Sequence, residues 1–207
     1  MLKIGALVSG GGTNLQAIMD AIDRDNIPAE VTCVVSSKDG AYALERAAKR
    51  NIETAVIRKK DYATAEEYEL TLAKFFKDRD VDLIVYAGFM IILGEAFVNQ
   101  FENRMINIHP ALIPSFCGKG YYGLHVHEAV LKAGVKVTGA TVHFVTAECD
   151  AGPIILQKAV EVMDDDTPET LQRRVMEQAE WIIYPEAVRL FAENKLEIVD
   201  CIVKRRN

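Results

Sequence analysis

The sequence predicts an α/β protein with a doubly wound, mostly parallel, twisted sheet and helices on both faces. Short apolar runs alternate with helical patterns along the first half of the chain, as parallel strands joined by crossover helices do. The runs are apolar almost throughout, which is typical of strands buried on both faces. The chain has 207 residues, 50% of them hydrophobic, and no linker-like stretch. We therefore expect one domain over residues 1–207.

Net charge and hydropathy restrict the kinds of partner. The net charge of −6 leaves no basic surplus for phosphate contacts, so we expect no nucleic-acid partner. The apolar run before the first glycines is too short for a signal sequence, and no run reaches the length of a membrane span. We therefore expect a soluble, cytoplasmic protein that has no membrane partner.

The cysteines give no sign of a disulfide framework or a metal site. Cys33, Cys117, Cys149 and Cys201 are widely spaced and form no CxxC pair, so we expect reduced thiols. A zinc site can be drawn from Cys117, His125, His127 and Cys149. The i, i+2 spacing of the two histidines is poor for sharing a metal from one helix face, and no metal is expected.

The N-terminal unit is a strand, a glycine-rich turn and a helix. Leu2–Val8 reads as a buried strand, and Ser9–Asn14, with three consecutive glycines, leads into the helical pattern Leu15–Ile22. This arrangement aims backbone N–H groups at an anion, although a tight turn that binds nothing stays an alternative. A P-loop is excluded because Gly-Lys-Ser/Thr is absent, and a dinucleotide fingerprint because Leu15 stands where a third glycine is required.

The remaining elements follow in order. Thr167 and Pro168 suit the N-cap and first turn of the last long helix, which Pro185 should break or kink. The final apolar run, Leu196–Val203, suggests an edge strand, and Arg58–Lys60 suggests a solvated loop or a contribution to an anion site. We expect strands at residues 31–35, 54–57, 81–86, 105–109, 138–145 and 154–162, and helices at residues 41–50, 64–77, 125–133 and 168–193.

Asn107 and His109 stand at the end of the expected strand over residues 105–109. Residues two apart in a strand face the same way, and the strand's end meets the crevice where open α/β sheets bind ligands. An amide donor beside a titratable ring suits a reaction that develops charge on a carbonyl oxygen. The alternative is that both side chains only satisfy loop backbone.

Three turns and loops complete the candidate site. The apolar turn Ala87–Gly94 can be core or the wall of a pocket for a flat ligand. Ala111–Leu124 contains glycines and tyrosines and suggests a mobile, functional loop that closes over such a ligand. Asp150 precedes Gly-Pro, where Asp is commonly a turn residue.

Five motifs follow one another along the chain. In chain order they are SGGGTNLQA (Ser9–Ala17), AGFMIIL (Ala87–Leu93), NIHPALIPSF (Asn107–Phe116), GATVHFV (Gly139–Val145) and DAGPIILQ (Asp150–Gln157). Together they resemble the motifs of the phosphoribosylglycinamide formyltransferases, a family of 10-formyltetrahydrofolate-dependent enzymes of purine biosynthesis. The resemblance covers residues 2 to about 195. The first motif looks specific to the glycinamide ribonucleotide enzymes, whereas others are shared by all 10-formyltetrahydrofolate-using formyltransferases and hydrolases.

The resemblance implies a fold and an activity. The formyltransferase fold has a Rossmann-like, mononucleotide-binding half, about residues 1–100, and a folate-side catalytic half, about residues 101–207. The implied reaction moves the formyl group of 10-formyltetrahydrofolate to the amine of N1-(5-phospho-β-D-ribosyl)glycinamide, in the one-carbon chemistry of IMP biosynthesis. The implied partners are these two small molecules, with the folate as co-substrate and no metal. A homodimer stays open.

The resemblance also assigns roles to matching positions. It implies that Asn107, His109 and Asp150 are catalytic, that Glu180 lies near the substrate ribose, and that His143 supports the site. It places the substrate phosphate at Gly12, Thr13 and Asn14, and the folate at Met90, Ile91, Ile92, Leu93 and Asn107.

The chain departs from the family pattern in two places that concern charge. Ala65 and Ile91 stand where relatives often carry arginines that meet anionic parts of the ligands, and Lys60, Lys119 or Arg58 are the candidates to replace them. Trp181 stands where relatives commonly have His, and its role is open.

The implied chemistry assigns a task to each catalytic residue. Amine attack on the formyl carbon creates an oxyanion, which the Asn107 amide and a protonated His109 would stabilise. Asp150 would orient His109 and raise its pKa. Among rival functions, a methionyl-tRNA formyltransferase would need a basic nucleic-acid-binding domain. A formyltetrahydrofolate hydrolase resembles the chain less at the glycine loop, and a non-catalytic nucleotide-binding module would leave the three polar residues unexplained.

Overall fold

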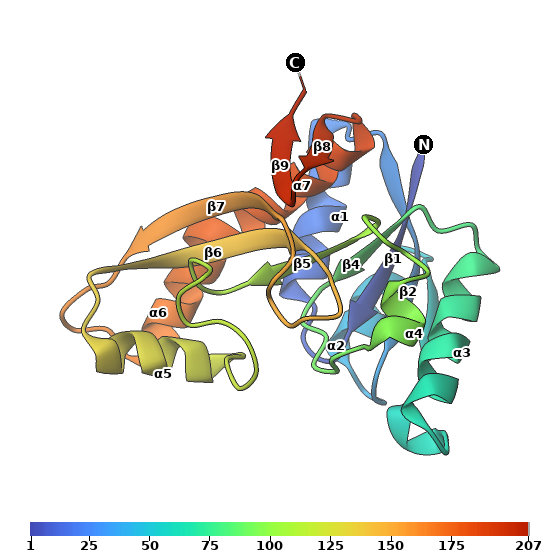
Figure 1. Cartoon of the computed structure of the whole chain (residues 1–207), viewed down its shortest axis with the longest axis horizontal. Helices are drawn as coiled ribbons and strands as arrows, with labels where there is room; N and C mark the ends of the chain where they lie inside the picture. The colour runs from blue at the N-terminus through green and yellow to red at the C-terminus, as the bar shows by residue number, and fades with distance from the viewer. Residues whose placement is uncertain (207) are drawn as a thin grey trace.

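A computed structural model describes residues 1–206 and shows a seven-stranded sheet with helices on both faces (Figure 1). The strand order is β3-β2-β1-β4-β5-β6-β7. Strands β1 to β5 pair in parallel, whereas β6 pairs antiparallel with both of its neighbours, β5 and β7. This confirms the predicted doubly wound, mostly parallel sheet. The strands are β1 (Leu2–Val8), β2 (Ala29–Ser36), β3 (Glu53–Val56), β4 (Leu83–Tyr86), β5 (Met105–His109), β6 (Val137–Phe144) and β7 (Ile154–Glu161).

The helices bury two separate apolar layers against the sheet. One layer packs under α1, α2, α5, α6 and α7, and the other packs under α3 and α4. Strands β1 and β4 lie between the layers, which is why their sequences are apolar on both faces. The helical segments are α1 (Thr13–Asp25), α2 (Tyr42–Ala48), η1 (Lys59–Asp61), α3 (Ala65–Lys77), α4 (Glu95–Val98), α5 (Leu124–Ala133), α6 (Pro168–Val175), η2 (Met176–Glu180) and α7 (Trp181–Ala192).

The chain reverses its direction of winding between β1 and β4, which are neighbours in the sheet. Such a switch point leaves a crevice outside the carboxyl ends of the strands. Ser9 holds the two loops at this crevice together. Its N–H donates to the Gly88 carbonyl over 3.1 Å, and its Oγ accepts from the Met90 N–H over 2.9 Å. The glycine-rich turn and the apolar turn are therefore fixed side by side.

The C-terminal part of the chain differs from the prediction in two ways. The last long helix is interrupted by the π-helical segment η2, and Pro185 lies inside α7 instead of ending it. The run predicted as one edge strand forms the separate hairpin of β8 (Leu196–Val199) and β9 (Ile202–Arg205). Asp200 and Cys201 have φ of 51° and 61°, and this left-handed pair turns the chain back on itself.

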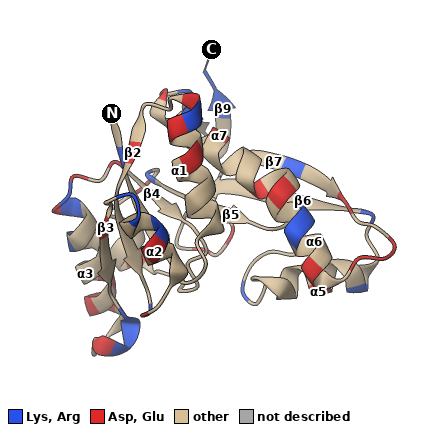
Figure 2. Ribbon diagram, turned by 180° about the vertical axis from the view of Figure 1, so that it is seen from behind, with Lys and Arg blue, Asp and Glu red and all other residues tan. Residues whose placement is uncertain are grey.

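The surface mixes charges of both signs. Lys and Arg residues are interspersed with Asp and Glu residues over α1, α2 and α3 (Figure 2). Arg50, just past α2, pairs with Asp20 at 2.5 Å and with Asp23 at 2.6 Å, both on α1. Within residues 1–206, no helix has the length and apolar character needed to cross a membrane.

The Tyr184 hydroxyl ties α7 to the sheet next to the crevice. It lies 3.0 Å from both the Tyr86 and the Ile106 carbonyl oxygens, and Tyr184 is fully buried. We expect Tyr184→Phe to lower the free energy of unfolding by about 1–3 kcal/mol, because two buried carbonyls lose their donor. Urea titration measures this, with Tyr42→Phe on exposed α2 as the control. A loss no larger than that of the control would contradict the role given to the hydroxyl.

Candidate active site

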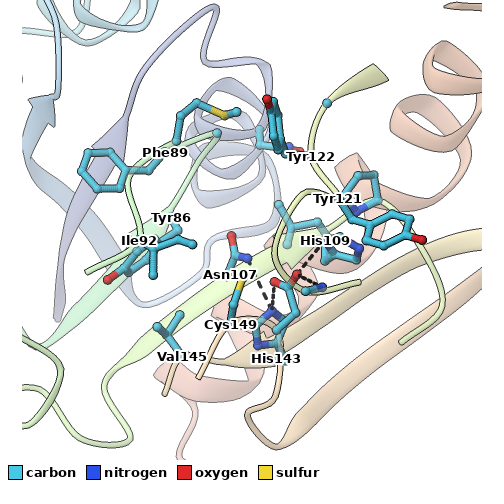
Figure 3. Close-up of a pocket in the computed structure, with 18 of the residues that line it drawn as sticks. Tyr86, Phe89, Ile92, Asn107, His109, Tyr121, Tyr122, His143, Val145 and Cys149 are labelled. Atoms are coloured by element: carbon cyan, nitrogen blue, oxygen red, sulfur yellow. Dashed lines mark hydrogen bonds and ion pairs between the residues drawn. The ribbon is translucent and has the colours of Figure 1, made fainter. Parts of the chain in front are cut away.

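A cavity of about 610 Å³ opens at the carboxyl ends of β1, β4 and β5 (Figure 3). Its wall is formed by the start of α1, residues 88–93 after β4, the end of β5, loop residues 118–123, and the turn after β6. The π-helical segment η2 contributes its two ends. The cavity therefore lies where the strand order predicts a ligand crevice.

The structure brings Asn107, His109, His143 and Asp150 together on this wall. Asn107 and His109 extend from the same face of β5, and Asn107 is paired across the strands with His143 of β6. The turn after β6 places Asp150 between the two rings. Its Oδ2 is 3.5 Å from His109 Nδ1, and its Oδ1 is 3.6 Å from His143 Nε2.

Asp150 is held as a carboxylate. Burial alone raises its pKa, but the adjacent His143 ring, the charge of His109 and the Gly118 N–H bond together lower the pKa to about 2. The Gly118 N–H donates to Oδ2 over 2.9 Å, so the loop after β5 is anchored to the same carboxylate. Asp150 has φ of 54°, and Asp tolerates that left-handed conformation better than most residues.

The pKa of His109 is lower than its usual value, whereas the sequence analysis expected Asp150 to raise it. Asp150 and the Phe116 carbonyl raise the pKa of His109, but burial lowers it more, and the pKa lies below its usual value. The prediction that Asp150 makes His109 charged was therefore incomplete, because the ring is only 4% exposed and the charged form loses its hydration. His109 Nε2 lies 2.8 Å from the Phe116 carbonyl oxygen. That nitrogen must carry the hydrogen, since a carbonyl only accepts.

The glycine-rich turn borders the same cavity through the start of α1. Gly12 begins α1 with φ of 69°, and a Cβ there would collide with Ala43. Thr13 and Asn14 line the cavity at the N-terminus of α1, where free backbone N–H groups favour an anion. Strand, turn and helix are thus arranged as the sequence predicted.

Glu180 lies against this turn although it comes from the far end of the chain. The Asn14 amide donates to Glu180 Oε2 over 2.7 Å. Glu180 is buried at the cavity wall. Burial raises its pKa to about 7, while the Asn14 hydrogen bond opposes that shift. The structure thus brings together a residue predicted for the phosphate and one predicted for the ribose.

Residues 90–93 form the apolar wall of the cavity. Met90 and Ile92 are exposed, whereas Leu93 is buried. Ile91 lines the cavity and packs against the layer under α3 and α4. This surface can hold a flat, apolar ring, as the sequence suggested for a turn at a strand's end.

Of the three cations considered as replacements for the missing arginines, Lys119 is the one that lines the cavity. Arg58 is engaged by Asp39 at 2.7 Å and by Asp61 at 2.6 Å, and Lys60 lies in η1 away from the wall. Ala65 begins α3. The indole N–H of Trp181 is buried without a hydrogen-bond partner in the described residues.

Sequence reasoning considered His127 only as a metal ligand and did not single out other residues of the wall, among them Gln172 and Met176. His127 is fully buried, and burial lowers its pKa to about 4. Neither of its ring nitrogens has a hydrogen-bond partner within residues 1–206. Helical spacing could show only that this position faces inward.

Within residues 1–206, no three His, Cys, Asp or Glu residues are grouped to hold a metal ion, so the cysteines and histidines drawn as a zinc site do not come together.

Comparison with known proteins gives a consistent result. A family model described as Formyl transferase matches residues 2–188. A phosphoribosylglycinamide formyltransferase of Haemophilus influenzae is 40% identical over 200 residues, which cover 97% of this chain and 92% of that protein. A trifunctional purine biosynthetic protein adenosine-3 of Gallus gallus is 43% identical over 95% of this chain, which spans 19% of the length of that protein. The solved structure of glycinamide ribonucleotide transformylase 1 from Symbiobacterium toebii is 43% identical with a TM-score of 0.94, covering 100% of this chain and 95% of that one.

The buried Glu180 carboxyl makes stability depend on pH. Its pKa is raised from 4.5 to about 7 in the folded protein, so the wild type loses stability as pH rises through that window. Gln cannot ionise, and its oxygen can still accept from Asn14. We compare the free energy of unfolding of Glu180→Gln with that of the wild type. We expect this difference, variant minus wild type, to increase by about 3 kcal/mol from a pH of about 5 to a pH of about 8. Urea titrations at both pH values measure this, and an unchanged difference would contradict the buried, proton-binding carboxyl.

Proposed function

The chain belongs to the Formyl transferase family, and on this premise we propose that it transfers a formyl group from 10-formyltetrahydrofolate to the amine of glycinamide ribonucleotide. The reaction is a step of purine biosynthesis. The observation that carries the proposal is that Asn107, His109 and Asp150 meet in the same cavity as the glycine-rich turn. That arrangement supplies oxyanion donors and an anion site within one crevice.

The proposed reaction makes one bond and breaks another at the formyl carbon. The substrate amine attacks that carbon, and a tetrahedral oxyanion forms. The Asn107 N–H₂ group and the His109 N–H stabilise the oxyanion. The carbon–N10 bond then breaks and N10 receives the His109 proton. The proton that the amine gives up returns to His109, so the ring ends as it began. Asp150 stays ionised, orients His109 and stabilises its charged form.

The loop after β5 must move for His109 to act in this way. Nε2 is occupied by the Phe116 carbonyl at 2.8 Å, and Nδ1 faces Asp150 at 3.5 Å. A substrate oxygen or N10 therefore reaches Nε2 only when the Phe116 carbonyl is displaced. Phe116 lies in the loop that the sequence identifies as mobile, and the loop lines the cavity through residues 118–123. Ligand entry and exposure of the His109 proton are thus coupled.

The two ligands fit different parts of the cavity wall. The N-terminus of α1 with Thr13 and Asn14 suits the substrate phosphate, and Glu180 beside it suits the ribose hydroxyls. The apolar wall of residues 90–93 suits the pterin, and Lys119 suits an anionic group of either ligand. Both halves of the chain then serve both ligands, since residues 90–93 of the first half suit the pterin and Glu180 of the second half suits the ribose.

A steady-state assay tests the proposed reaction. Purified protein is given 10-formyltetrahydrofolate with and without glycinamide ribonucleotide, and loss of the formyl donor is followed spectroscopically. We expect turnover only when the ribonucleotide is present, because its amine is the acceptor. Equal turnover without the ribonucleotide would identify a hydrolase and overturn the proposal.

Substitution of the catalytic residues tests their roles. We expect His109→Ala and Asp150→Asn each to lower kcat by on the order of 10² to 10³, because the oxyanion and the leaving nitrogen lose their charged donor. Equilibrium binding of a folate analogue should change little in both variants. His125→Leu, at an exposed position on α5, is the control and should keep the wild-type rate. Near-normal kcat in either active-site variant would show that the roles are misassigned.

A further inference from the structure

His143 contacts two residues of the proposed catalytic set through one ring nitrogen. It lies across from Asn107 in the β5–β6 pairing and is buried. Its Nε2 is 3.4 Å from Asn107 Nδ2 and 3.6 Å from Asp150 Oδ1 (Figure 3). The nitrogen therefore faces an amide group that donates and a carboxylate that accepts.

The other ring nitrogen has a fixed state. His143 Nδ1 is 2.8 Å from the Phe144 carbonyl oxygen, and a carbonyl only accepts, so Nδ1 carries a hydrogen. When the ring is neutral, Nε2 is bare and accepts from the Asn107 N–H₂ group. When the ring is charged, the Nε2 hydrogen points at Asp150 and at Asn107, which must then present its carbonyl oxygen. The state of Nε2 thus selects the direction of the Asn107 amide.

The direction of that amide decides what Asn107 offers to a ligand. In the structure the N–H₂ group faces His143, and the carbonyl oxygen points away from the ring (Figure 3). An oxyanion donor needs the reverse arrangement, with the N–H₂ group toward the formyl oxygen. A 180° turn of the amide achieves this without moving the backbone, since the oxygen and nitrogen of an amide exchange places.

We propose that His143 is the positioning residue for the Asn107 amide: in the substrate complex its Nε2–H holds the Asn107 carbonyl oxygen and so directs the N–H₂ group to the formyl oxygen. The inference rests on the proposed formyl transfer. The charged and titratable groups around the ring are Asp150, whose carboxylate balances the imidazolium, and His109 on β5. On the other side, β7 pairs the apolar Ile154 with His143.

A double-mutant cycle separates positioning from a structural role. We expect His143→Leu to lower kcat by about 10- to 100-fold. Removal of an oxyanion donor lowers kcat by about 10² to 10³, and in this variant the Asn107 donor is still present but no longer directed. In an Asn107→Ala background the same change should cost less than about threefold, because the group it directs is gone. His143→Gln can still hold the amide and should recover part of the rate. Equal losses in both backgrounds would overturn the proposal.

Nitrogen-15 spectra of the histidine rings test the proposal without turnover. Wild-type protein is examined alone and with glycinamide ribonucleotide plus a folate analogue in which carbon replaces N10. His143 is assigned by its absence in His143→Leu, and Nδ1 should be protonated in both samples. We expect Nε2 to be protonated in the complex, and a bare Nε2 there would refute the proposal even if every variant folds poorly. Absence of turnover by the wild type would instead refute the proposed function.

Discussion

The contacts of Asp150 determine the arrangement of the site. Its two oxygens face His109 on β5, His143 on β6 and the Gly118 N–H of the loop between α5 and β5. These groups belong to β5, to the loop that follows it and to β6, and one buried carboxylate holds the three segments together. A buried charge is tolerated only when it is paired and hydrogen-bonded. The same interactions that keep Asp150 ionised therefore fix the two imidazole rings and the start of the loop.

Burial gives the polar groups around the cavity unequal protonation. It raises the pKa of Glu180, and it lowers the pKa of His109 and of His127. Each shift disfavours the charged form, as desolvation does. Asp150 is the exception, because its partners outweigh its burial. The site therefore starts with Asp150 ionised, while burial holds the pKa of His109 below its usual value and that of Glu180 above it.

The arrangement of the sheet explains how two ligands can share one cavity. The switch point between β1 and β4 brings the N-terminus of α1 and the apolar turn of residues 88–93 to the same crevice. The antiparallel strands β6 and β7 extend the sheet beyond β5 and bring His143 next to Asn107. The groups proposed to react therefore share one cavity with a helix N-terminus that suits a phosphate and an apolar turn that suits a flat ring.

The sequence by itself determined the strands, most helices and the phosphate-type turn, because apolar periodicity, glycines and helix caps act over short distances. It also pointed to Asn107 and His109, which share a face through strand geometry alone. The contact of His109 with Asp150 and the Asn14–Glu180 bond came only from the tertiary structure, since each joins segments that are far apart in the sequence. The same holds for the His127 ring, which has no hydrogen-bond partner within residues 1–206. The tertiary structure likewise decided the pKa of His109 and the C-terminal hairpin. Burial lowered the pKa of His109 more than Asp150 raised it. The left-handed residues Asp200 and Cys201 turned a run that was predicted as one strand into a hairpin.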